Sequence, residues 1–260
     1  MITNRFTKIF VFLLLIGGFS SLSFAQQNAQ ALFDDANEKL GKGNYQQAIS
    51  LYQNLEDNNT VSGALFLNMG ISYQRIDSLG KAKYYFLKAS QFEETEQQAQ
   101  KALEFVESQF SRQSAVLPKL PWDIATGWMQ EHIGAKNILL IGIITLNIGV
   151  FIFIAHWFMQ AYPKILRIGG LSLIVAALLI ITTSFYTQYI SERYSKAVMV
   201  TDQVAVLEEP VEEAPVVSRA YEGYSFTVDH RQSNSQQGWS YVRMSNGLYG
   251  WIPNSEILIL

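Results

Sequence analysis

Few residues in this chain are of a type that could carry out catalysis. Its 260 residues include three histidines and no cysteine. His132, His156 and His230 lie in three different kinds of segment, so they do not form a clustered zinc motif. The sequence also has no thiol nucleophile, no glycine-rich phosphate loop and no nucleophile elbow. We therefore predict a protein that is not an enzyme and that binds no metal and no cofactor.

The charged residues indicate neither an acid–base site nor a nucleic-acid surface. The acidic pairs Asp34–Asp35 and Glu93–Glu94 are interpreted as solvated helix charges. The net charge of −3 gives no basic footprint for nucleic acid. Apolar residues make up 49% of the chain and charged residues only 16%, a balance that is unusual for a soluble domain. This composition favours a protein with a large share of its residues in lipid.

Two long apolar runs account for that composition. Neither Ile138–Met159 nor Ile168–Ile190 contains a charged residue. About 20 apolar residues at about 1.5 Å per residue cross the roughly 30 Å hydrocarbon layer of a bilayer. The sequence therefore predicts a transmembrane hairpin, with residues 160–167 as a tight cytoplasmic turn.

Two further signals predict on which side of the membrane the polar segments lie. Residues 1–25 read as a secretory signal peptide, with a basic start, an apolar middle and Ser23-Phe24-Ala25 as the cleavage signal; an uncleaved anchor remains an alternative. Lys164 and Arg167 lie in the predicted turn, and cytoplasmic loops are rich in such residues. We expect a bacterial inner-membrane protein with two spans and with both terminal domains in the periplasm.

Residues 26–110 are helical in pattern and contain an internal repeat of 34 residues. Small and aromatic residues recur at this period, so that Ala36, Ala48 and Tyr52 are followed by Gly70, Ala82 and Phe86. Two repeats (29–62 and 63–96) and an amphipathic capping helix resemble a tetratricopeptide repeat domain. The small residues are expected to let the paired helices approach closely, although the closing proline of the family is missing.

This resemblance implies a concave groove that binds a partner segment. Asn37 and Asn68 match two asparagines that clamp a terminal carboxylate in some members of the family. The basic partners of that clamp are missing here, so a mixed apolar and polar groove is the preferred interpretation. The predicted groove residues are Phe33, Asn37, Leu40, Asn68, Ile71, Gln74 and Arg75.

The segment 111–137 is predicted to be an interfacial linker. Pro118 and Pro121 interrupt the preceding helix, and Trp122 and Trp128 come shortly before the first span. Tryptophan is enriched at the boundary between lipid and water. A short helix in the plane of the membrane, from Trp122 to Ile133, is therefore expected.

Residues 196–260 change to a strand pattern. The predicted strands are 197–200, 204–207, 224–228, 239–244 and 249–252. Asn246-Gly247 between the last two is a strong hairpin signal, and five or six short strands in about 65 residues favour a small barrel. The sequence segments Gly238–Val242 and Gly247–Ile252 resemble the closing hairpin of the bacterial SH3-like domain. Tyr224, Tyr241 and Tyr249 are candidates for its binding surface, and Trp239 and Trp251 are interpreted as structural.

The expected fold class is thus a multi-domain membrane protein with an all-α repeat domain, a two-helix hairpin and an all-β SH3-like barrel. This order, with the Pro118–Trp122 passage and the Ala197-Val198-Met199 entry to the barrel, resembles the BatE-type members of the Bat aerotolerance family. The resemblance implies a subunit of an assembly with von Willebrand A-type Bat proteins and a MoxR-type ATPase, linked to stress or oxygen tolerance.

Two hypotheses for function follow. In the first, the protein is a non-enzymatic periplasmic scaffold, which binds membrane and periplasmic partner proteins through its groove and barrel. In the second, it is a cell-wall sensor whose SH3-like domain binds peptidoglycan. A transporter component would need charged or cavity-lining residues that the two spans lack.

Overall fold

The computed structural model describes residues 28–112, 116–118, 121–159 and 162–260. The predicted signal peptide, 1–25, lies outside the described residues. The chain divides into two compact units. One comprises residues 1–114, 196–226 and 250–260, and the other comprises 115–195 and 227–249.

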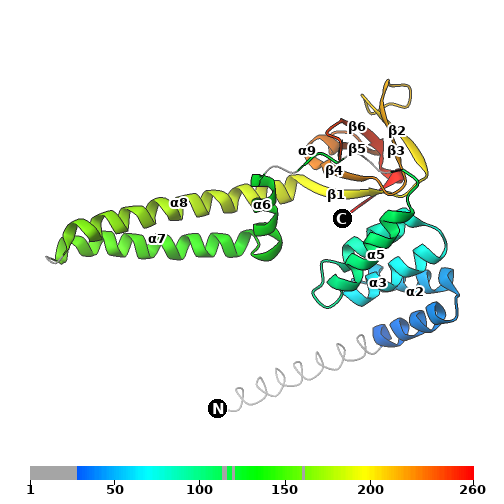
Figure 1. Cartoon of the computed structure of the whole chain (residues 1–260), viewed down its shortest axis with the longest axis horizontal. Helices are drawn as coiled ribbons and strands as arrows, with labels where there is room; N and C mark the ends of the chain where they lie inside the picture. Colours follow the sequence, from blue (N-terminus) through cyan, green and yellow to red (C-terminus); the bar gives the residue numbers. More distant parts are fainter. Residues whose placement is uncertain (1–27, 113–115, 119–120, 160–161) are drawn as a thin grey trace, which may run out of the picture. The chain divides into compact units, whose positions relative to one another are not determined.

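The N-terminal half is helical, as the periodicity predicts (Figure 1). A first helix covers 28–41. It is followed by α2 (Tyr45–Asp57), α3 (Gly63–Arg75), α4 (Leu79–Ala89) and α5 (Glu96–Gln109). The N-terminus of α3 is capped by Ser62, whose hydroxyl accepts a hydrogen bond from Leu65 N at 3.1 Å.

The residues that recur at a spacing of 34 form the core of this helical region. Ala36, Ala48, Tyr52, Ala82 and Phe86 are completely buried. The remaining residue of the 34-residue pattern is Gly70. A Cβ atom placed on Gly70 would lie 2.5 Å from the ring of Phe86. The expected close approach of α3 and α4 is therefore present, and it requires glycine at this position.

Three helices follow in the second unit: α6 (Pro121–His132), α7 (Ala135–Phe158) and α8 (Pro163–Arg193). Both α7 and α8 are long and apolar enough to cross a membrane. They pack along each other as a hairpin (Figure 1). Their contact is close at Gly170, where an added Cβ would lie 2.7 Å from Phe153 N, whereas one on Gly169 would meet nothing within 4 Å.

One detail of the hairpin differs from the sequence-based expectation. α8 begins at Pro163, so Lys164 and Arg167 lie in its first two turns and not in a loop. Proline at the first helical position has a backbone angle that suits a helix start, which explains the longer helix. Within α7, Asn147 donates from Nδ2 to the Ile143 carbonyl of the same helix at 2.8 Å.

The C-terminal region forms one antiparallel sheet of seven strands, in the order β3-β2-β6-β5-β4-β1-β7. Two strands, β3 and β7, and the short helix α9 were not expected from the sequence. The bounds are β1 Tyr194–Met199, β2 Gln203–Leu207, β3 Val216–Tyr221, β4 Ser225–Asp229, α9 His230–Ser233, β5 Trp239–Met244, β6 Tyr249–Pro253 and β7 Ile257–Ile259.

The turn between β5 and β6 follows the predicted hairpin signal. Gly247 has a φ of 88°, a conformation that favours glycine. Its N–H donates to Met244 O at 2.9 Å, and Met244 N donates to Leu248 O at 2.8 Å. The Asn246-Gly247 prediction is thus confirmed.

Candidate functional site

The two asparagines of the predicted groove lie in contact with each other. Asn68 in α3 donates from Nδ2 to the Oδ1 of Asn37, in helix 28–41, at 2.8 Å. The same Oδ1 accepts a hydrogen bond from the Tyr52 hydroxyl of α2 at 2.6 Å. Three helices are therefore joined at one amide oxygen.

Tyr52 was identified from the sequence only as a residue of the 34-residue repeat, yet its hydroxyl binds Asn37, one of the predicted groove residues. Its ring is completely buried, and burial raises the pKa of Tyr52 to about 12 while the hydrogen bond to Asn68 opposes that shift. The hydroxyl therefore remains protonated at physiological pH and acts as a donor. Phe33 packs against the same ring, with centroids 6.0 Å apart.

The other predicted groove residues lie on the same two helices. Leu40 and Ile71 are half-buried and pack against the helical core. Gln74 is half-buried, and Arg75 is exposed in the last turn of α3. The face of helix 28–41 and α3 that carries these residues thus offers apolar side chains beside fixed amides.

Two of the three predicted surface tyrosines also lie together. In β5, Ser240, Val242 and Met244 are buried, whereas the residues between them face away from the core. Tyr241 stacks on Tyr249 with ring centroids 6.1 Å apart and planes 18° apart. The guanidinium of Arg243 lies 5.7 Å from the Tyr249 centroid.

This tyrosine pair is accessible from solvent. Tyr249 is 50% exposed, and its neighbour Leu248 is 42% exposed. Trp239 and Trp251, interpreted as structural, are half-buried. The third candidate, Tyr224, is not part of the pair, because it packs edge-on against Tyr221 with centroids 5.6 Å apart.

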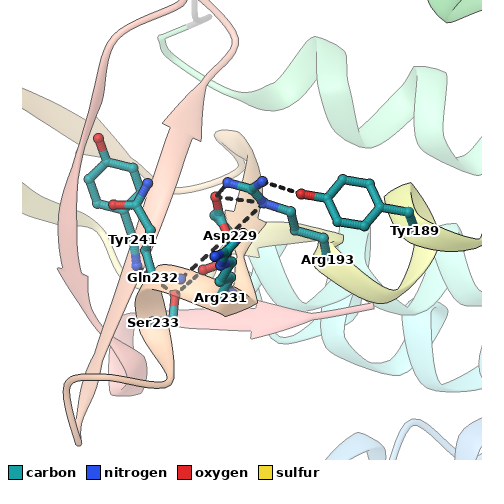
Figure 2. Close-up of polar contacts among 7 residues, drawn as sticks. All are labelled: Tyr189, Arg193, Asp229, Arg231, Gln232, Ser233 and Tyr241. Atoms are coloured by element: carbon teal, nitrogen blue, oxygen red, sulfur yellow. Dashed lines mark hydrogen bonds and ion pairs between the residues drawn. The ribbon is translucent and has the colours of Figure 1, made fainter. Parts of the chain in front are cut away.

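A polar joint that the sequence did not reveal connects α8 to the end of β4. Arg193, the last residue of α8, donates from Nη2 to Asp229 Oδ2 at 2.7 Å and from Nε to the same carboxylate at 3.2 and 3.3 Å. Figure 2 shows the guanidinium between this carboxylate and the hydroxyl of Tyr189, to which it also donates. Such a forked arrangement fixes direction as well as distance.

Asp229 has a second role in the same joint, as the N-cap of α9. Its Oδ1 accepts from the backbone N–H of Arg231 at 3.0 Å and of Gln232 at 3.4 Å. Burial acts to raise the pKa of Asp229, but the hydrogen bonds from Arg193 and from these backbone groups bring it below its usual value. The carboxylate is therefore ionised at physiological pH.

Further contacts extend the joint to the neighbouring strands. The ring nitrogen Nε2 of His230 lies 2.8 Å from Ser195 Oγ, just after the end of α8. Ser233 Oγ accepts from Tyr241 N at 2.8 Å and donates to the Asp229 carbonyl at 2.8 Å (Figure 2). The joint thus connects α8, α9 and β5 within the second unit.

In the first unit, the start of α4 is bound to a turn of the sheet region. Gly80 N donates to Glu222 Oε1 at 2.7 Å, and the buried Lys83 Nζ donates to Gly223 O at 2.9 Å. Lys83 also pairs with Glu107 of α5 at 3.0 Å. Burial raises the pKa of Glu222, which the hydrogen bond from Gly80 only partly offsets.

Among the described residues, no group of three or more His, Cys, Asp or Glu side chains is arranged to hold a metal ion. The ring nitrogens of His132 and His156 contact backbone carbonyls of their own helices. Comparison of the chain with protein-family models and with curated proteins gives no match. Function is therefore argued from the geometry described above.

Proposed function

We propose that this protein is a two-pass inner-membrane protein that acts as a periplasmic scaffold and not as an enzyme. Its helical region would be a tetratricopeptide repeat domain, and its sheet would be an SH3-like module. The observation that carries the proposal is the connection between α8 and the sheet. β1 begins at Tyr194, the residue directly after α8, and Arg193 is held by Asp229.

Exposed apolar surface on the hairpin supports insertion in a membrane. On α7, Phe151 is 75% exposed, and on α8, Leu179 and Phe185 are 65% and 61% exposed. Soluble proteins rarely expose apolar patches of this extent. Such an apolar surface is stable when it is surrounded by lipid.

The proposed topology can be tested by labelling single cysteines, since the natural chain has none. Ser108→Cys on α5 and Ser255→Cys near β7 are exposed positions, and Lys164→Cys lies in the first turn of α8. In spheroplasts, a membrane-impermeant maleimide should label the first two variants, and it should label Lys164→Cys only after permeabilisation. Labelling of Lys164→Cys in intact spheroplasts would contradict the proposed orientation.

The surface of helix 28–41 and α3 that carries the predicted groove residues is the proposed contact with partner proteins. The apolar side chains and the fixed Asn37–Asn68 pair suit an amphipathic helix or an extended segment. The resemblance to BatE-type proteins makes von Willebrand A-type Bat subunits, with a MoxR-type ATPase, the proposed partners. The linkage to stress or oxygen tolerance rests on the same resemblance.

A photo-crosslinking experiment tests this proposal. A benzoylphenylalanine at Arg75, the exposed end of the groove, should give cross-linked products from membranes, and mass spectrometry should identify a second membrane-bound subunit in them. The matched control is the same group at Glu104, an exposed position on α5. Equal product from both positions would contradict a groove-specific partner.

The alternative function, binding of cell-wall peptidoglycan, is favoured by the exposed Tyr241–Tyr249 pair with Arg243 beside it. Aromatic faces bind sugar rings and peptide stems through burial of apolar area. Co-sedimentation of the detergent-solubilised full chain with purified peptidoglycan tests this idea. Tyr249→Ala should abolish sedimentation, and Phe105→Ala, which removes an exposed ring from α5, should not; a chain that stays in the supernatant excludes the alternative.

A further inference from the structure

We propose that α6 is a membrane-surface helix, which lies with its apolar side in the boundary between lipid headgroups and acyl chains. The proposal rests on insertion of the α7–α8 hairpin in the membrane. It adds a third lipid contact to the two spans. This contact would be parallel to the bilayer and would not cross it.

The first argument is the distribution of residues around α6. Ile124 and Trp128 are four positions apart, and they are 57% and 54% exposed. At about 100° per residue, Ala125 and Met129 continue the apolar side from Trp128 and lie opposite Gly127, which is about 60° from Ile124 at the edge of that side. The spacing places the polar residue types Asp123, Gln130 and Glu131 on the side of Gly127. The helix is thus amphipathic.

The second argument is the way in which α6 ends. The N–H groups of Ile133 and Gly134 both donate to the Met129 carbonyl at 3.0 Å, which closes the helix. Gly134 has a φ of 76°, and α7 begins at the next residue, Ala135. A glycine with positive φ at this place changes the direction of the chain between the two helices. In Figure 1, α6 runs across the end of the α7–α8 hairpin and not along it.

The third argument is the level at which α6 meets the hairpin. The hydroxyl of Ser184 donates to the Ala135 carbonyl at 2.7 Å, so the first residue of α7 is level with residue 184 of α8. Directly beyond that level on α8 lie Tyr186 and Tyr189, which are 48% and 46% exposed. Tyrosine and tryptophan are enriched where a span leaves the hydrocarbon layer. α6 therefore joins the hairpin at the height of its aromatic belt.

These observations select lipid, and not a protein partner, as the occupant of the exposed side. Only two residues of the chain separate α6 from α7, the first helix of the proposed membrane hairpin, so the exposed side of α6 begins close to the proposed lipid-facing surface. Trp128 stacks on His132 with centroids 5.0 Å apart, so the apolar side ends in a ring that can also make polar contacts. Amphipathic helices of this kind lie about 5–10 Å into the headgroup boundary.

The test uses spin labels on single cysteines in the full chain, reconstituted in phosphatidylcholine–phosphatidylglycerol nanodiscs. Ala125→Cys and Gly127→Cys form a matched pair, because both positions are exposed and they lie about 200° apart around the helix. A Cβ at Gly127 meets nothing within 4 Å, so this variant is tolerated. Ile144→Cys in α7, an exposed position in the middle of the span, reports whether the hairpin is inserted.

Power saturation with oxygen and with a water-soluble nickel chelate gives the depth of each label. We expect a several-fold higher ratio of oxygen to nickel accessibility at Ala125→Cys than at Gly127→Cys, and a still higher ratio at Ile144→Cys. If both α6 positions are equally accessible to nickel while Ile144→Cys is deep in lipid, the hairpin is inserted but α6 is not a membrane-surface helix. A label at Ala125 shielded from both reagents would show a protein contact and overturn the membrane-surface helix as well.

If Ile144→Cys is itself accessible to nickel, the hairpin is not inserted, and the proposed function fails together with the inference. Circular dichroism of each variant checks that the helices are formed. The comparison within one helix removes the effect of detergent or lipid composition, since both labels share the same sample conditions.

Discussion

The guanidinium of Arg193 and the carboxylate of Asp229, 36 residues apart in sequence, form a forked ion pair at the point where α8 meets the sheet. The Asp229 side chain is only 9% exposed, so the pair is largely shielded from water. Its carboxylate also caps α9. One carboxylate therefore fixes both the direction in which α8 ends and the start of the next helix.

Asp229→Asn is expected to destabilise this region by about 1–3 kcal/mol, since a charged hydrogen-bond acceptor is lost beside a guanidinium that stays in place. Hydrogen exchange of α9 and of the last turn of α8, measured in nanodiscs, should become faster. Asp57→Asn, at the exposed last residue of α2, is the control. Unchanged exchange in Asp229→Asn would show that the pair contributes nothing to the joint.

The same residue predicts a pH dependence. Because the pKa of Asp229 is lower in the folded state, its contribution to stability is present above the unfolded pKa, about 3.9. It is lost as the pH falls through the folded value. The difference in exchange between wild type and Asp229→Asn should therefore be constant from pH 7 to about pH 5 and should vanish in stronger acid. A gap that does not shrink as the pH falls below the unfolded pKa of about 3.9 would contradict this assignment.

Gly170→Ala is expected to disturb the hairpin, because the new Cβ would lie 2.7 Å from the Phe153 backbone nitrogen. The two helices must then separate, and overpacking of this kind costs about 1–3 kcal/mol. The thermal midpoint of the chain in detergent should fall. Gly169→Ala is the matched control, since nothing lies within 4 Å of its added atom; equal midpoints for the two variants would contradict the observed packing.

The Asn37–Tyr52 contact allows a double-mutant cycle. Tyr52→Phe removes one hydrogen bond and should cost about 0.5–1.5 kcal/mol, whereas Asn37→Ala leaves the buried Tyr52 hydroxyl without this acceptor and should cost about 1–3 kcal/mol. The double variant should cost less than the sum of the two. Urea titration followed by circular dichroism measures the three values, and strict additivity would show that the contact is not stabilising.

Glu222→Gln is expected to stabilise the contact between α4 and the turn that carries Glu222. Burial raises the pKa of Glu222, so the folded state binds the proton more tightly than the unfolded state, and stability decreases as the pH rises through the unfolded value. Glutamine keeps an acceptor for Gly80 N without the charge. The thermal midpoint of this variant should exceed that of wild type at pH 7 and equal it in acid, while Glu213→Gln in an exposed loop should have no effect.

The helices and strands that have a clear local sequence pattern could be predicted from the sequence. The uncharged runs identified both long helices, and the 34-residue spacing identified the buried residues Ala48, Tyr52 and Phe86. β3 was missed because its alternation is weak, with Ser218 and Arg219 in its centre, and because its pairing with β2 shifts register between Val206 and Leu207. The C-terminal strand β7 contains only three residues, too few for a periodic signal.

The polar contacts of the candidate sites could be predicted only in part. Asn37 and Asn68 were predicted to share one groove because they match two asparagines that clamp a carboxylate in some tetratricopeptide repeats. Arg193 and Asp229 could not be paired, since the contact depends on how the sheet returns to the end of α8. The signal that could have been used was local: Asp229 precedes a short polar segment, and aspartate in that position commonly caps a helix.

The direct passage from α8 into β1 also determines the range over which the sheet can act. A flexible linker of n residues extends the reach of a domain by roughly 5–6 Å × √n, but no residue lies between α8 and β1. If α8 crosses the bilayer, the Tyr241–Tyr249 pair, which belongs to the same unit as α8, can be occupied only by a ligand that comes close to the membrane. A partner anchored in the same membrane meets this condition without a search in three dimensions.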